Sequence, residues 1–330
     1  MKNRLLLNCL LALLVLSAAA LSIDKEHKGA DVSEFEVAAQ SLLDEADSVF
    51  QSHDYQGALA KYQESLQQAR REFNRPVEVE ALAQLARVYL IQGNKEEGRK
   101  WLAQAQEKAS DNDPMGWSRY LGVRGRFEWK DDSLPAARQT FDEMYTYCNV
   151  NAIWGRAVDA AHMIAIVAET PGEQIEWSRR GIEAAEAGDQ EKWLGPLWNN
   201  LAITYYDQKL YDTALDCFLK AREYHWRYSD ETAKLFADYH VGMIYRYLGK
   251  YDEAGKWLRP VLAWAERLKN RGAIGQACED LGEIAIAQGN KGEGLSLLRR
   301  ARDEYKAEGY DQSWPELWQS INKRLKELGG

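Results

Sequence analysis

The sequence predicts an all-α solenoid of about seven antiparallel helix pairs, closed at its C-terminal end by one capping helix. Two observations lead to this fold class. Residues that favour helices (Ala, Leu, Glu, Gln, Lys and Arg) are abundant, only 7 Pro occur in 330 residues, and no convincing alternating strand pattern is present. A short pattern of small and bulky residues also recurs about every 40 residues. Such a period indicates stacked repeats, each of which contacts only its neighbours.

Residues 1–20 have the pattern of a cleavable secretory signal. Lys2 and Arg4 precede a leucine-rich run over residues 5–16, and small residues follow at 18–20. The run is shorter than the roughly 20 residues of a membrane-spanning helix, which favours cleavage over retention as an anchor. No Cys follows the small residues, so a lipoprotein is not indicated. We therefore expect export without stable membrane insertion, to the periplasm of a Gram-negative source and otherwise into the medium.

Residues 21–36 are charged and lack apolar periodicity, so we interpret them as a flexible linker. Removing the two positive charges of the signal changes the formal charge from −9 to −11, which disfavours nucleic acid as a partner. Three cysteines remain at wide spacing, and they fit neither a disulfide framework nor a metal site. We expect Cys148, Cys217 and Cys278 to be small buried side chains.

The seven predicted repeats cover residues 37–312. Six of them have a small residue near the centre, a second small residue twelve positions earlier and a bulky apolar residue four positions later; in the fourth repeat, Gln174 takes the central place. These offsets suit two antiparallel helices that cross closely, with the bulky residue filling the gap beside the crossing. The central positions are Ala58, Gly98, Ala137, Gln174, Ala214, Ala254 and Gly294. In the fourth repeat the earlier position is either His162 or, if the turn Glu169–Gly172 shifts the register by one residue, Ala161.

The fifth repeat carries the pattern most completely, with Trp198, Leu201, Ala202, Tyr205, Tyr211, Ala214, Phe218 and Ala221 in order. This pattern resembles the tetratricopeptide repeat, in a variant of about 40 residues instead of the common 34. The resemblance covers residues 37–312. It implies a right-handed solenoid whose first helices line a concave surface, where such arrays hold their partners.

Residues 313–330 have the features of a complete capping helix: Ser313 as N-cap, an early Pro315, late lysines and a terminal glycine. A cap is expected because the last repeat has no neighbour to cover its apolar face.

No catalytic chemistry is predicted. The chain has no nucleophile elbow, phosphate-binding loop, dinucleotide-binding motif, zinc-protease motif or EF-hand. Of its five His, four lie in different repeats and His27 lies in the linker. We therefore expect neither an enzyme nor a metal or cofactor site.

Helical spacing selects candidate partner-binding residues on the first helices. The repeats two to four contribute a basic stretch, and repeats five and six contribute amide and aromatic groups. The candidates are Arg87, Arg119, Arg126, Trp129, Arg156, Asn199, Tyr206, Tyr239 and Arg246.

We hypothesise that the partner is a protein or peptide segment whose carboxylates are held by arginine forks in repeats two to four, from Arg87, Arg119, Arg126 and Arg156. The alternative is that these arginines neutralise nearby Asp and Glu. The resemblance and the signal together favour an exported adaptor or scaffold in envelope assembly or escort. A sensor that binds a small ligand or a short signalling peptide is the second hypothesis.

Overall fold

The computed structural model describes residues 34–329, which form sixteen helices and no strand. These residues form two compact units, and the boundary between them in the sequence falls between Leu197 and Trp198, inside α10 (Glu191–Asp207). Each unit is a stack of antiparallel helix pairs, and the predicted fold class is confirmed. The predicted signal and the linker up to residue 33 lie outside the described residues, whereas α2 already begins at Glu34 within the predicted linker.

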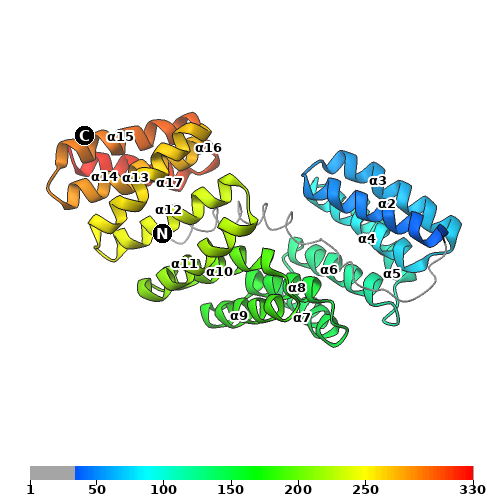
Figure 1. Ribbon diagram of the computed structural model, residues 1–330. Helices are drawn as coiled ribbons and strands as arrows, with labels where there is room; N and C mark the ends of the chain where they lie inside the picture. The colour runs from blue at the N-terminus through cyan, green and yellow to red at the C-terminus, as the bar shows by residue number, and fades with distance from the viewer. Residues whose placement is uncertain (1–33, 330) are drawn as a thin grey trace. The chain divides into compact units, whose positions relative to one another are not determined.

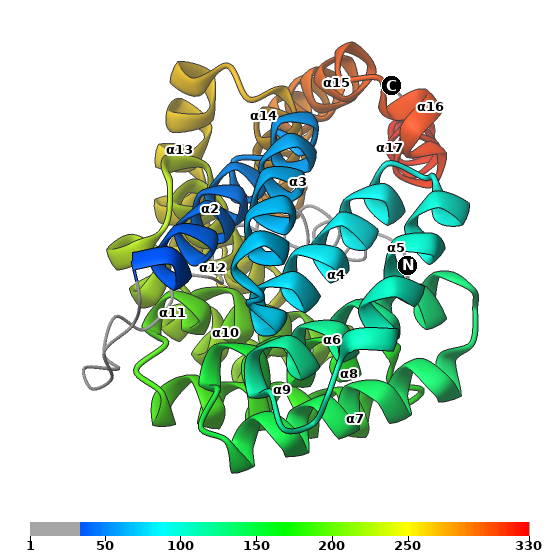
Figure 2. The ribbon, with the colours of Figure 1, turned by 90° about the vertical axis from the view of Figure 1, so that its right-hand side faces the viewer.

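The unit that ends at Leu197 contains four complete helix pairs, coloured blue to green in Figure 1. Consecutive helices are joined by short turns and pack against each other, as Figure 2 shows for α2 and α3. The pairs are α2 (Glu34–Gln51) with α3 (Tyr55–Glu72), α4 (Arg75–Ile91) with α5 (Lys95–Lys108), α6 (Pro114–Lys130) with α7 (Leu134–Val150), and α8 (Trp154–Val167) with α9 (Pro171–Ala187).

The unit that begins at Trp198 contains the last residues of α10 and all the later helices, coloured up to red in Figure 1. These helices are α11 (Tyr211–Tyr228), α12 (Glu231–Tyr247), α13 (Tyr251–Leu268), α14 (Arg271–Ala287), α15 (Lys291–Ala307), α16 (Tyr310–Ser313) and α17 (Pro315–Glu327). With α10 as the partner of α11, the described residues make seven pairs. We call α2, α4, α6, α8, α10, α12 and α14 the first helices.

Polar side chains and turn residues define where the helices begin and end. The side chains of Asp54, Asn94 and Asp230, for example, each accept a hydrogen bond from the backbone N–H three residues later. An N-cap of this kind stabilises a helix by about 1 kcal/mol. In six of the seven pairs, all except α8 with α9, the turn has a left-handed residue. It is glycine in the near-identical segments at 92–98 and 288–294, where φ is 81° at Gly93 and 88° at Gly289.

The small residues of the repeat pattern lie where the two helices of a pair cross. A Cβ atom on Gly125 would lie 2.6 Å from Cε1 of Phe141, the bulky residue of the same repeat. In the fourth pair, Ala161 is fully buried, and a Cβ on Gly181 would lie 3.4 Å from the Ala161 Cβ. Ala161 therefore lies against the second helix of its pair, as the shifted register predicts.

The last helix, α17, packs against α15 through Leu317, Ile321 and Leu325, which are buried on one face. This is the predicted capping helix. The prediction of Ser313 as its N-cap is wrong, because Ser313 ends the single turn of α16 and its hydroxyl donates to the backbone oxygen of Gly309 at 3.0 Å. Trp314 is the N-cap of α17.

The three cysteines expected to be buried are free and buried: Cys148, Cys217 and Cys278. Within residues 34–329 we find no helix whose length and apolar character would let it cross a bilayer.

Candidate functional site

The nine predicted partner-binding residues all lie on first helices, but they divide between the two units. Arg87 is on α4, Arg119, Arg126 and Trp129 are on α6, and Arg156 is on α8. The other four, Asn199, Tyr206, Tyr239 and Arg246, are on α10 and α12 in the unit that begins at Trp198.

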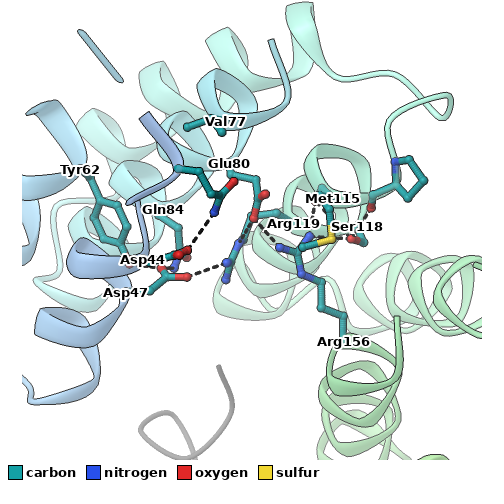
Figure 3. A network of polar contacts seen from close by, with 12 residues as sticks. Asp44, Asp47, Tyr62, Val77, Glu80, Gln84, Met115, Ser118, Arg119 and Arg156 are labelled. Atoms are coloured by element: carbon teal, nitrogen blue, oxygen red, sulfur yellow. Dashed lines mark hydrogen bonds and ion pairs between the residues drawn. The ribbon is translucent and has the colours of Figure 1, made fainter. Parts of the chain in front are cut away.

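Arg119 and Arg156 are the centre of a buried polar network that joins four first helices (Figure 3). Arg119 is 7% exposed; its Nη2 lies 2.8 Å from Oδ2 of Asp47 on α2, and its Nε lies 3.1 Å from Oε2 of Glu80 on α4. Arg156 reaches the same Glu80 oxygen from α8 and donates to the Ser118 hydroxyl at 2.7 Å. Two guanidinium groups therefore face two carboxylates in the interior.

Hydrogen bonds from neutral side chains complete the network. The Tyr62 hydroxyl and the Gln84 amide donate to Oδ1 of Asp47 at 2.5 and 2.7 Å. Burial raises the pKa of Asp47, but Arg119 and these two hydrogen bonds outweigh burial and hold the pKa below its ordinary value. Asp47 is therefore ionised at neutral pH and cannot release Arg119 without a large cost.

Arg126 is likewise paired within the chain. Its Nη2 lies 2.7 Å from Oδ1 of Asp159 on α8, and its Nη1 donates to the Gly122 backbone oxygen at 2.9 Å. Three of the four arginines that we selected for partner carboxylates thus have internal acidic partners. For these three, the geometry favours the alternative reading, in which arginines neutralise nearby Asp and Glu.

Arg87 differs from the other three arginines. Its guanidinium lies over the Phe50 ring, 4.8 Å from the centroid, and no carboxylate within residues 34–329 is paired with it. Burial, together with the charge of Arg126, lowers the pKa of Arg87 to about 10. Trp129, at the end of α6, is half-buried beneath the Lys130 ammonium, which lies 4.4 Å from the ring centroid.

In the unit that begins at Trp198, predicted residues converge on one pocket, which we call the aromatic pocket. Tyr206, Tyr239 and Arg246 line it, and it has a volume of about 40 Å³. Asn199 is buried elsewhere on α10. The full lining is Tyr206, Tyr239, Met243, Arg246, Tyr247, Gln276, Glu279, Asp280, Tyr305, Trp314 and Leu317.

The polar groups of the aromatic pocket come from α12, α14 and α15. Arg246 Nε lies 2.6 Å from Oδ1 of Asp280, and its guanidinium carbon lies 4.1 Å from the Tyr247 ring centroid. The Tyr305 hydroxyl donates to Oε2 of Glu279 at 2.8 Å. Burial would lower the pKa of Arg246, but Asp280 more than compensates and raises it. The pocket therefore combines aromatic walls with fixed charges.

Sequence reasoning missed Gln276, Asp280, Tyr305 and Trp314. Asp280 had a signal, because it follows Arg246 by 34 residues, much as Asp159 follows Arg126 by 33. In both cases this spacing, shorter than the repeat of about 40 residues, places an arginine and an aspartate side by side on consecutive first helices. Trp314 is the N-cap residue of α17, and Tyr305 lies on α15, the second helix of its pair. Both lie outside the first helices, from which the candidates were chosen.

Within the described residues, no three His, Cys, Asp or Glu side chains are arranged to hold a metal ion.

Comparisons with known proteins identify the repeats. Family models of the tetratricopeptide repeat match residues 49–118, 199–225 and 239–267. No curated protein sequence matches the chain.

The solved structures that are similar in fold include the following three. A signal-transduction ATPase (STAND protein) with a tetratricopeptide repeat sensor from Pyrococcus horikoshii has a TM-score of 0.68 at 16% identity, covering 88% of this chain and 45% of that one. The apo quorum sensor NprR from B. thuringiensis has a TM-score of 0.59 at 16% identity, covering 89% and 82%. BtubC from P. vanneervenii has a TM-score of 0.57 at 14% identity, covering 66% and 92%.

The chain spans less than half the length of the STAND protein, and at these identities the likeness concerns the fold. The family matches and the seven helix pairs agree with one another. The chain is an all-α solenoid that contains tetratricopeptide repeats.

Proposed function

We propose that this protein is a binding scaffold without catalytic activity, which holds a protein or peptide segment on the first helices of the unit that begins at Trp198. One observation carries the proposal: Tyr206, Tyr239 and Arg246, selected from the sequence as partner-binding residues, line a single pocket. Tyr206 and Tyr247 at its edge are partly exposed, with ring centroids 4.9 Å apart. Partly exposed tyrosines supply large contact areas at low entropic cost, which suits a binding surface.

The arginines of the other unit are less suited to hold a partner. A carboxylate on a partner would have to displace Asp47, Glu80 or Asp159 from its guanidinium, and breaking a buried ion pair costs about 3–5 kcal/mol. For this reason we assign the contact to the aromatic pocket and its surroundings, and we do not require an acidic partner.

A sensor for a small ligand or a short signalling peptide is the second candidate. The size of the aromatic pocket favours it, because about 40 Å³ accommodates the end of one small group and not a folded partner. A small ligand would then act by tightening the contacts of α12, α14 and α17 around it.

We also propose that the scaffold acts outside the cytoplasm, as an adaptor in envelope assembly or escort. The support is the basic, leucine-rich and small-residue pattern of residues 1–20.

Selection from a displayed peptide library on the full chain tests the scaffold. Selected peptides should lose at least tenfold in affinity for Tyr206→Ala, because this change removes a wall of the aromatic pocket. The control is Tyr228→Ala on α11, a tyrosine that is 41% exposed and not part of the pocket. Equal affinity for both variants would contradict the proposed site. If no peptide is selected while small molecules raise the melting temperature, the sensor replaces the scaffold.

A further inference from the structure

We propose that the aromatic pocket binds an alkylammonium group, as carried by a free amine, a lysine side chain or a peptide N-terminus. For the two peptide sources, the inference rests on the scaffold function proposed above. A free amine tests it without that assumption.

The formal charge of the lining favours a cation. Its three charged side chains are the Arg246 guanidinium and the Glu279 and Asp280 carboxylates, which leave one negative charge in excess when all are ionised. Arg246 already lies against one oxygen of Asp280. An anionic ligand would place a further negative charge beside the Glu279 and Asp280 carboxylates in a partly buried site, which is costly. The charge therefore selects a monocation.

Two acceptor oxygens in the lining have no donor. Oδ2 of Asp280 and Oε1 of Gln276 are buried and lack a hydrogen-bond partner among the described residues. Asp280 is 4% exposed and Gln276 is 9% exposed. Buried acceptors are rarely left unsatisfied in folded proteins, so a missing donor indicates a ligand or an ordered water. An ammonium group supplies three donors and no acceptor, which matches this need.

The walls of the pocket are suited to contact the methylene groups next to the ammonium nitrogen of such a ligand. Tyr206, Tyr239, Tyr305 and Trp314 are aromatic, and aromatic faces attract cations. Leu317 adds apolar surface. The volume of about 40 Å³ holds roughly three water-sized groups, which corresponds to an ammonium with one or two methylenes. A flat guanidinium needs more room, so we favour the ammonium.

The test is a titration of the full chain with n-butylammonium, followed by NMR or calorimetry. We expect saturable binding, at least tenfold weaker binding of n-butanol, and no binding of butyrate. Equal affinities for n-butylammonium and n-butanol would mean that the pocket takes any donor, water included. That result, or no binding of n-butylammonium, would overturn the proposal.

The matched variants are Gln276→Met and Gln319→Met. Gln276→Met removes one acceptor without changing the charge, and it should fold with an unchanged or higher melting temperature because no unsatisfied oxygen is left in its place. Its affinity for n-butylammonium should fall at least tenfold. Gln319→Met makes the same change at an exposed position of α17 and should keep full affinity. Unchanged affinity in a folded Gln276→Met variant would contradict the assignment.

The source of the ammonium is distinguished with peptides from the library selection. Loss of binding on Nα-acetylation identifies a peptide N-terminus, and loss on acetylation of lysine identifies a side chain. If n-butylammonium binds but no peptide is selected, the ammonium site stands and the scaffold function fails. If selected peptides bind Gln276→Met with wild-type affinity, the scaffold stands and the ammonium site fails.

Discussion

Replacing Arg119 by Met should destabilise the unit that contains α2–α9 far more than an ordinary surface change. The guanidinium makes hydrogen bonds to Asp47 at 2.8 Å and to Glu80 at 3.1 Å, and all three side chains are buried. A hydrogen bond to a charged group contributes about 1.5–3 kcal/mol, and removing one partner of a buried ion pair costs about 3–5 kcal/mol. Because Asp47 would then lose its ion-pair partner and Glu80 would keep only Arg156, we expect a loss of about 3–5 kcal/mol.

Urea unfolding followed by circular dichroism measures this loss. Arg138→Met is the matched control, because Arg138 makes its ion pair with Glu173 at the surface and should lose less than about 1 kcal/mol. Adding Asp47→Asn to Arg119→Met restores the charge balance, so the double variant should be more stable than the sum of the two single changes predicts. A loss below about 1 kcal/mol for Arg119→Met, or strict additivity in the double variant, would refute the argument.

Three further perturbations test local features of the fold. Ala152→Gly should stabilise the folded protein by about 1 kcal/mol, because residue 152 has a left-handed backbone with φ of 56°. The control Ala103→Gly, at an exposed position inside α5, should destabilise it by about 1 kcal/mol. Melting temperatures that move in the same direction for both variants would contradict this prediction. Gly125→Val should cost about 1–3 kcal/mol by overpacking the helix crossing, and a denaturant midpoint equal to that of wild type would be inconsistent with the close contact. Burial lowers the pKa of His240 to about 3 in the folded protein, so as pH falls the imidazole takes up a proton in the unfolded chain before it does in the folded one. The free energy of unfolding should therefore fall as pH decreases from about 6.5 towards 3, by roughly 2 kcal/mol at pH 5. In His240→Phe the unfolded chain should take up one proton fewer, so the free energy of unfolding should depend less steeply on pH. An unchanged slope of this free energy between pH 7 and pH 5 would show that His240 is not the group responsible.

The fold could be predicted from the sequence because its main constraint is steric. Gly125 and Phe141 are complementary in size at a fixed spacing, and the same spacing recurs for Gly242 with Leu258 and for Gly282 with Leu298. Helix ends were less predictable, since Gly309 starts an additional turn that takes Ser313 out of the N-cap position. Such turns depend on local backbone geometry that residue spacing does not encode.

The site was only partly predictable. Helical position is enough to place Tyr206, Tyr239 and Arg246 on first helices, and they do share a pocket. Position alone could not show that Arg119 faces Asp47, because the two residues are 72 apart in sequence and meet only when three helices stack. Candidate arginines chosen by helical position alone therefore overestimate the positive charge that a partner could contact, because carboxylates of neighbouring repeats already pair with them.

The ion pairs between consecutive first helices also determine the order in which the repeats can be assembled. Glu80 with Arg119, Arg126 with Asp159, and Arg246 with Asp280 each join one repeat to the next, and each uses a different position on the helix. A transposed or inserted repeat would leave buried charges facing apolar groups or like charges, although its apolar crossing would still fit. Units that look interchangeable by size are thus made specific to their neighbours by charge, and a chain with shuffled repeats would stack in the wrong register or not at all.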